Sequence, residues 1–372
     1  MTLTISDSMI SSHNRPSGFD YLRMILACAV VTSHVINVTQ GRVYTEQVWN
    51  SPARPFLAII LPVFFGLSGF LVSGSLERCK TLISFLGLRI LRLVPALAVD
   101  TSISALIIGP AFTTFTLQHY FSDPMFATYW RNIIGEVQFN LPGVFLQNPT
   151  TAVNAQLWTL PYELLCYASL SALALFGIAR DRRAFLAATI LAILVNFAWS
   201  GLLHQTVRTT TVGYAVLVEA FLLGVCFYLY RDRVPLNRWL CALSILGSWL
   251  CFTVPLGDNF AAIPATYLVV YLGLLNPPRI KLVSSGDYSY GIFLYGYPIQ
   301  QTTYSLFPGM PWPVQLAVSF IGIFALAAFS WWCVEAPALK LRPYLYNFEA
   351  RAFVWINRLP FGTFLTRAPA SR

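Results

Sequence analysis

The chain has 372 residues, of which 56% are hydrophobic and only 10% are charged. Soluble domains carry about a quarter of their residues as charged side chains, so this composition excludes a soluble globular protein. The net charge of +9 does not indicate nucleic-acid binding, because membrane proteins collect Lys and Arg in their cytoplasmic loops. We therefore expect a polytopic membrane protein that binds the lipid bilayer and no nucleic acid.

Ten apolar segments have lengths that suit a bilayer crossing. In chain order they are residues 19–38, 56–76, 89–109, 157–178, 184–203, 211–230, 238–255, 259–275, 288–306 and 314–333. They predict an all-α protein with a single bundle of about ten transmembrane helices, which forms one domain over residues 19–337. The polar residues 1–18 are expected to form a disordered cytoplasmic tail.

The distribution of cations predicts the orientation of this bundle. With the N-terminus inside, 20 of the 24 Lys and Arg residues fall on the cytoplasmic side, and only Arg42, Arg54, Arg131 and Arg208 fall outside. Cytoplasmic loops carry the excess of Lys and Arg, so both termini are predicted to be cytoplasmic.

Two regions outside the spans are predicted to pack on the bundle or on the membrane. Residues 110–156 form a long outer connection rich in aromatic side chains, which we interpret as a partly ordered lid or re-entrant element. In the C-terminal tail, residues 338–372, apolar side chains from Tyr344 to Leu359 recur at helical spacing. This pattern predicts an amphipathic helix in the cytoplasmic interface.

Two ionisable residues interrupt the first apolar segment: Arg23 and, eleven positions later, His34. Such residues cost about 2.5–3.5 kcal/mol at the bilayer centre, so they usually have a function. His34 lies within about 20° of Arg23 around the helix and roughly 16 Å further along it. Since histidine titrates near neutral pH, His34 is a candidate general base. The structural alternative pairs Arg23 with Asp20 and buries a hydrogen-bonded His34.

Three charged residues near the third and fourth spans are further candidates. Arg89 and Arg92 share a helix face and could clamp a phosphate, although ordinary positive-inside flanking explains them equally simply. Glu163 lies several residues into a span, with Thr159 and Tyr167 one turn away on either side. It is either functional or a structural hydrogen-bond anchor.

Small and aromatic residues give weaker signals. Gly66, Ser68 and Gly69 suit either close helix packing or exposure of the backbone to a ligand. Tyr290 and Tyr297, seven positions apart, suit either a cavity wall or interfacial anchoring. Glu335, at the end of the last span, is a candidate partner for an arginine.

Taken together, the motifs closely resemble those of the acyltransferase 3 family of integral-membrane O-acyltransferases. The segments that carry the resemblance, from about Phe19 to Pro337, are F-D-x-L-R-x10-H, F-F-x-L-S-G-F-L, R-x-x-R, L-P-G-V-F, L-W-T-L-P-Y-E, S-Y-G-I-F-L-Y and V-E-x-P. The resemblance implies transfer of an acyl group, usually acetyl, from cytoplasmic acyl-CoA to a sugar hydroxyl of a polysaccharide, lipid-linked glycan or similar acceptor. It also implies location in the bacterial inner membrane.

The resemblance assigns roles to five residues and requires no metal. The implied catalytic residues are His34, Arg23 and Glu163, and the implied acyl-CoA-binding residues are Arg89 and Arg92. Ser68 and Tyr290 are added as acyl-CoA-binding candidates because their segments suit a ligand cavity. Many members have a histidine where this chain has Gly296, which concentrates base function on His34. Glu163 is expected to orient His34 or to bind the sugar.

Several alternatives stay open at this point. His34 either deprotonates the acceptor directly or carries the acyl group briefly. Intramembrane Arg, His and Glu would also suit a proton-coupled transporter or exporter, although no inverted repeat is visible. A scaffold protein that uses the long outer loop, and acylation of a small secondary metabolite, are further possibilities.

Overall fold

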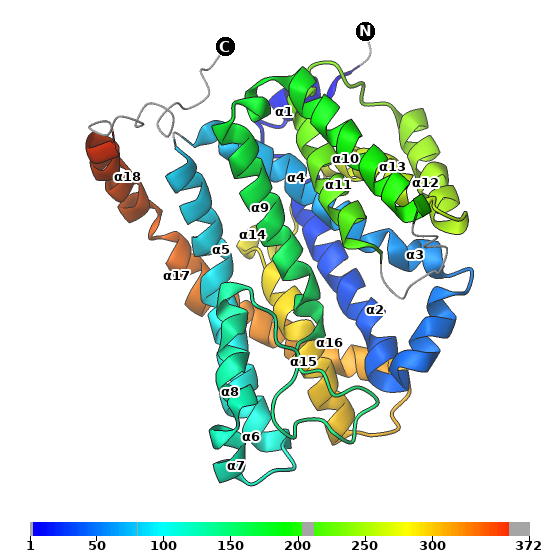
Figure 1. Ribbon diagram of the computed structural model, residues 1–372, viewed down its shortest axis with the longest axis vertical. Coiled ribbons are helices and arrows are strands. Elements are labelled where there is room, and N and C mark those ends of the chain that lie inside the picture. Colours follow the sequence, from blue (N-terminus) through cyan, green and yellow to red (C-terminus); the bar gives the residue numbers. More distant parts are fainter. Residues whose placement is uncertain (1–2, 80, 203–211, 357–372) are drawn as a thin grey trace.

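The computed structural model describes residues 3–79, 81–202 and 212–356. Figure 1 shows the helices: α1 Ile5–Ser11, α2 Gly18–Trp49, α3 Arg54–Ala58, α4 Ile60–Arg78, α5 Leu82–Ile103, α6 Gly109–Phe112, α7 Leu117–Ser122, α8 Pro124–Tyr129, α9 Leu160–Leu175, α10 Arg182–Leu202, α11 Tyr214–Leu229, α12 Arg238–Thr253, α13 Asp258–Gly273, α14 Lys281–Ser285, α15 Ser289–Leu306, α16 Trp312–Ser330, α17 Ala336–Leu339 and α18 Arg342–Ile356. Short helical turns complete the set: η1 Ser104–Ile108, η2 Trp130–Ile134, η3 Ala155–Thr159, η4 Ile178–Arg180 and η5 Trp331–Glu335.

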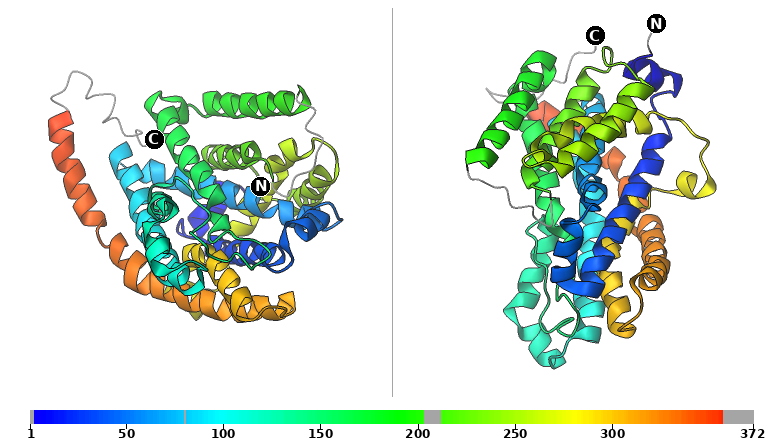
Figure 2. Two further views of the ribbon diagram at one scale, coloured as in Figure 1. Left: turned by 60° about the horizontal axis from the view of Figure 1, so that its bottom comes forward. Right: turned by 90° about the vertical axis from the view of Figure 1, so that its right-hand side faces the viewer.

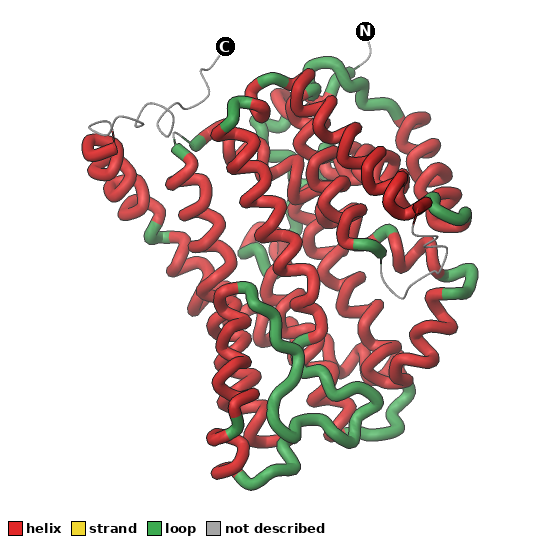
Figure 3. Tube along the Cα trace, in the orientation of Figure 1, coloured by secondary structure: helices red, strands yellow, loops and turns green. Residues whose placement is uncertain are grey.

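The all-α prediction is confirmed for the described part of the chain, where Figure 3 draws helices and connecting loops and no strand. Each of the ten predicted segments overlaps one long helix, although four of them also include parts of shorter helical elements. Five helical stretches are long and apolar enough to cross a membrane: Gly18–Trp49, Arg54–Arg78, Leu82–Phe112, Arg182–Leu202 and Trp312–Ala350. The protein is therefore a membrane protein, and ten crossings stay a prediction.

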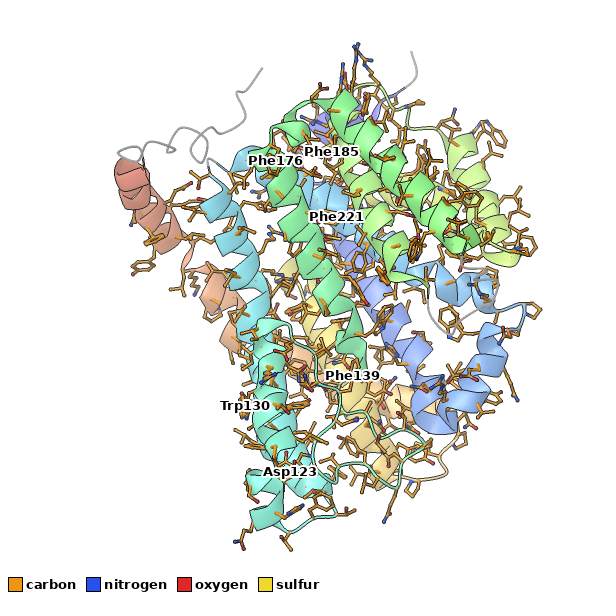
Figure 4. The ribbon with its side chains drawn as sticks, in the orientation of Figure 1. Asp123, Trp130, Phe139, Phe176, Phe185 and Phe221 are labelled. Carbon is orange, nitrogen blue, oxygen red and sulfur yellow. The ribbon has the colours of Figure 1, made fainter. Side chains whose placement is uncertain are left out.

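The helices form one bundle with two distinct ends (Figure 1). We call them the α1 end, where the chain begins, and the α7 end, where α6, α7 and α8 project. In Figure 2, α16, α17 and α18 follow the outside of the bundle, and α10 lies on the opposite side. Figure 4 labels Asp123 and Trp130 near the α7 end, and Phe185 and Phe221, both fully buried, nearer the α1 end.

Small residues bring α4 and α11 into close contact near the middle of the bundle. A Cβ at Gly69 would overlap the carbonyl oxygen of Phe221, and a Cβ at Gly224 would overlap that of Gly66. Two helix backbones can approach this closely only where the side chain is absent. Of the two readings of Gly66 and Gly69, helix packing is therefore the one that the structure favours.

The first residues correct the expectation of a disordered tail over residues 1–18. Thr4 and Asp7 form a reciprocal capping box at the start of α1, and Ile5 is fully buried. The amide of Ile5 also donates to the carbonyl of Val234 at 3.1 Å. A polar composition concealed this helix, because one buried isoleucine and a satisfied N-cap are enough to dock it on the bundle.

The long connection over residues 110–156 packs back on the bundle, mainly on α15. The side-chain amide of Gln301 donates to the carbonyls of Thr150 (2.8 Å) and Ala152 (2.6 Å). Asn148 bonds the side chain of Gln301, and Gln156 donates to the carbonyl of Leu294 at 2.6 Å. These bonds hold the connection against the helices, while a lid function stays a prediction.

At the other end of the chain, α18 lies beside α5. Leu345 packs against Gly87, and the buried Glu349 accepts a hydrogen bond from the hydroxyl of Thr81. Tyr344 and Phe348 are exposed on the same helix. The amphipathic prediction extended to Leu359, and residues 357–372 lie outside the described part.

The approach of α4 to α11 predicts a strong effect of side-chain size at Gly69. We expect Gly69→Val to prevent stable folding, because its Cβ has no space against Phe221. The matched control is Gly201→Ala, since no atom lies within 4 Å of a Cβ placed there. Size-exclusion chromatography in detergent measures both, and a monodisperse Gly69→Val protein with wild-type Tm would contradict the packing account.

Candidate active site

Two cavities among the described residues contain the side chains that the sequence singled out. The first, about 550 Å³, opens among α2, α4, α5, α9, α15 and the C-terminal helices, and we call it the arginine cavity. Five arginines line it: Arg23, Arg78, Arg89, Arg92 and Arg342. The second, about 380 Å³, is lined by His34 and by residues from the α7 end, and we call it the histidine cavity.

Asp287 organises the charges at the arginine cavity. Its Oδ2 accepts hydrogen bonds from Arg23 Nη1 at 2.6 Å and from Arg92 Nη2 at 2.7 Å, and Ser289 Oγ donates to Oδ1 at 2.6 Å. Burial disfavours the charged form of Asp287, but the Arg92 and Arg23 guanidiniums outweigh that effect and lower the pKa of this carboxyl. Arg92 also donates to the buried Glu335 at 3.1 Å, as the sequence suggested for that glutamate.

Three of the five arginines form no salt bridge with a described residue. Within the described residues, no carboxylate lies in salt-bridge distance of Arg78, Arg89 or Arg342, whereas Arg23 and Arg92 are both paired. Arg89 donates to Ser75 Oγ at 3.1 Å, and its guanidinium lies 6.0 Å from the ring centre of Tyr167. The cavity therefore presents positive charge to whatever enters it, which suits an anionic ligand.

Glu163 faces the arginine cavity and accepts a hydrogen bond from the hydroxyl of Tyr167, one turn further along α9. Ser68 and Tyr290 line the same cavity, and the Tyr290 hydroxyl donates to the carbonyl of Leu93 at 3.2 Å. Tyr167, on the same helix, therefore holds the Glu163 carboxyl so that it faces the arginines.

The histidine cavity has a different character. The ring of His34 meets the ring of Tyr297 edge-on at 5.3 Å, and Asn37 donates to the Tyr297 hydroxyl at 3.1 Å. Two tryptophans, Trp49 and Trp158, line it together with several uncharged polar side chains and one cation, Arg42. The lining contains no carboxylate. Such a surface suits a hydroxyl-rich ligand better than a cationic one.

A bend in α2 shapes this second cavity. Gly41 adopts a left-handed φ of 77°, which interrupts the helix, and a Cβ there would meet Pro149 of the long connection at 3.4 Å. Beyond the bend, visible in Figure 1, the final segment of α2 brings Thr45 and Trp49 to the cavity wall. Glycine is suited to this position because other residues adopt such a φ only with strain.

The two cavities meet at four residues that line both of them: Val30, Leu61, Thr159 and Phe293. We call this set the partition. Val30 lies between Arg23 and His34 on α2, at seven residues from the first and four from the second. The helix face predicted from the spacing of Arg23 and His34 therefore runs from one cavity to the other.

The structure separates the sequence-predicted site residues into two groups. Arg23, Ser68, Arg89, Arg92, Glu163 and Tyr290 line the arginine cavity, and His34 lines the histidine cavity. The expected orientation of His34 by Glu163 is not what the structure shows, because Glu163 bonds Tyr167 and faces the other cavity.

Sequence reasoning missed three charged residues of the arginine cavity. Asp287 lies two positions before Ser289, where a carboxylate preceding an apolar span, followed by a serine, could have marked a helix start. Arg78 and Arg342 entered the sequence analysis only through the count of cytoplasmic cations. In the described part of the chain, no group of three or more His, Cys, Asp or Glu could hold a metal ion.

A family model described as an acyltransferase domain matches residues 17–333. The chain belongs to the acyltransferase 3 family. It is 29% identical over 359 residues to "Nodulation protein 10" of Rhizobium leguminosarum bv. viciae, a match that covers 89% of this chain and 95% of the relative. It is 24% identical over 349 residues to the "O-acetyl transferase" of Shigella phage Sf6, covering 87% and 96%. No solved structure matches the chain.

As a member of the acyltransferase 3 family the protein is an O-acyltransferase. Its departure from the family pattern at Gly296 has a structural counterpart. Gly296 is buried on α15, and a Cβ there would lie 2.6 Å from Val31 Cγ2 on α2. A larger side chain at this position would have to displace the side chain of Val31, so glycine permits the close contact of α2 with α15.

The pairing at Asp287 predicts a stability effect. Asp287→Asn leaves Arg23 and Arg92 without their shared anion, and we expect it to destabilise the fold by about 2 kcal/mol or more. Because the pKa of Asp287 is lowered in the folded state, its contribution is present above about pH 4 and is lost as the pH falls. Tm in detergent as a function of pH measures both effects.

The matched control is Glu46→Gln, which breaks the exposed pair of Arg42 and Glu46. Exposed pairs contribute about 0–1 kcal/mol, so its Tm should stay near that of the wild type. Equal Tm values for Asp287→Asn and Glu46→Gln would show that Asp287 does not organise the cavity.

Proposed function

We propose that the protein transfers an acyl group from cytoplasmic acyl-CoA to a sugar hydroxyl on the outer side of the bacterial inner membrane, with acetyl as the first candidate for the transferred group. The observation that carries this proposal is the meeting of a cationic cavity and a histidine cavity at four shared residues. In this proposal the α1 end faces the cytoplasm, in line with the excess of Lys and Arg in the loops assigned to the inside.

The arginine cavity suits the donor. Coenzyme A carries phosphate groups, and Arg78, Arg89 and Arg342 offer guanidiniums that form no salt bridge with a described carboxylate. Arginine binds phosphate oxygens through charge-assisted and often bidentate hydrogen bonds. In this proposal Arg23 and Arg92, held by Asp287, form the wall against which the pantetheine arm lies. Ser68 and Tyr290 complete that wall.

The histidine cavity suits the acceptor. The C–H faces of a sugar ring pack well on the flat rings of Trp49 and Trp158, and its hydroxyls find partners in Asn37 and Gln156. The name of the phage relative supports an acetyl group. A polysaccharide unit, a lipid-linked glycan or a smaller glycosylated metabolite would each present such a ring.

The chemistry follows from the position of His34. The acceptor hydroxyl gives its proton to the imidazole as its oxygen attacks the thioester carbonyl. The C–O bond forms, the C–S bond breaks, and the coenzyme A thiolate leaves and takes up the proton. We favour this direct transfer over an acyl-histidine intermediate. Glu163, through Tyr167, acts as a positioning residue on the donor side.

Replacement of His34 tests the proposal. We expect His34→Ala to lower acyl transfer from acetyl-CoA by about 100-fold or more, because general-base catalysis contributes about that much. Coenzyme A binding should be unchanged, since His34 lies outside the arginine cavity. Mass spectrometry of glycans from cells with and without the protein supplies the acceptor and the mass of the transferred group.

The matched control is His119→Ala, which removes an exposed histidine of α7 that lines neither cavity. This variant should retain wild-type transfer. Retention of transfer by His34→Ala would refute the assigned base. Movement of a glycan across the membrane without any acyl transfer would favour a transporter instead.

A further inference from the structure

The four residues of the partition come from four separate elements of the bundle. Val30 belongs to α2, Leu61 to α4 and Phe293 to α15, and Thr159 ends η3. Val30 and Thr159 are buried, while Leu61 and Phe293 are half-buried. All four side chains line both cavities, so the partition is the mainly apolar layer at which the two cavities adjoin.

The partition lies where the transferred group has to be during the reaction. His34 is four residues beyond Val30 on α2, a rise of about 6 Å. The acyl carbonyl is attacked beside His34 while its sulfur is still on the side of the arginine cavity. The carbonyl therefore lies among the partition side chains. With the acceptor sugar in the histidine cavity, the rest of the acyl chain has only the partition itself to occupy.

The chemistry of the partition restricts which acyl groups fit. Val30, Leu61 and Phe293 are apolar, and Thr159 contributes one hydroxyl. No cation belongs to this set, and Arg23 lies seven residues before Val30, about 10 Å along the helix. A methyl group is well accommodated in such surroundings, whereas a carboxylate such as that of a succinyl group would find no cation and only the Thr159 hydroxyl as a donor among these four side chains.

We propose that the partition selects the acyl group by size and charge, with the ring of Phe293 closing the space beyond the methyl of an acetyl group. This inference rests on the proposed function and adds the donor class: short, uncharged acyl thioesters of coenzyme A. One extra methylene in a confined apolar pocket changes specificity by about 10-fold or more. Removal of the Phe293 ring should therefore admit chains that are a few carbons longer.

A competition assay tests this selection. Purified protein in detergent receives acetyl-CoA, butanoyl-CoA and succinyl-CoA at equal concentration with a glycan acceptor, and mass spectrometry measures the product ratio. This ratio is independent of the fraction of protein that is folded. We expect the wild type to form mainly the acetyl product, and Phe293→Ala to raise the butanoyl-to-acetyl ratio by about 10-fold or more. The succinyl product should stay minor in both.

Two further variants keep the test decisive. Phe293→Leu, a smaller change, should raise the butanoyl ratio by an intermediate amount even if Phe293→Ala folds poorly. Phe320→Ala removes the same ring from α16, where Phe320 lines neither cavity, and should leave the ratio at its wild-type value.

The outcomes separate the two levels of the proposal. An unchanged ratio in both Phe293 variants, or a wild type that prefers the butanoyl or succinyl donor, overturns selection by the partition and leaves the proposed acyl transfer intact. A wild type that transfers no acyl group from any coenzyme A thioester overturns the proposed function, and the selection with it.

Discussion

The arrangement of the site depends on one carboxylate that accepts hydrogen bonds from two arginines of different helices. Asp287 connects Arg23 of α2 with Arg92 of α5, and Arg92 reaches on to Glu335 at the end of η5. Charges within a membrane bundle are tolerated when they are paired. This network therefore fixes the helices that surround the arginine cavity, and it accounts for two of its five cations without any ligand. The remaining three arginines are available to bind a ligand.

This division of the arginines changes the meaning of the R-x-x-R motif. Sequence spacing places Arg89 and Arg92 on one face and suggests a single clamp. In the folded protein Arg92 is neutralised by two carboxylates, whereas Arg89 contacts Ser75 and the ring of Tyr167. The partners that distinguish them are 195 and 243 residues away in sequence. Local spacing carries no information about contacts at such separations.

The apolar pattern predicted the helices well, because each span must satisfy its backbone hydrogen bonds internally and must be apolar over its length. It also singled out candidate residues that line the two cavities, since ionisable side chains in apolar segments are rare. It did not predict α1, which docks through the buried Ile5 and through backbone hydrogen bonds to the connection between α11 and α12. Nor did it predict the role of Asp287, which lies in a connection. It also could not separate Glu163 from His34. That separation depends on how α9 is placed against α2, which the spacing along one chain does not determine.

The central claim is that donor and acceptor reach the reaction from opposite ends of the bundle. Proteoliposomes that hold the protein in one orientation test it most directly, because coenzyme A thioesters do not cross a bilayer. The account predicts acyl transfer to an acceptor on one side only when acetyl-CoA is supplied on the opposite side, at the α1 end. Transfer that requires acetyl-CoA and acceptor on the same side would contradict it.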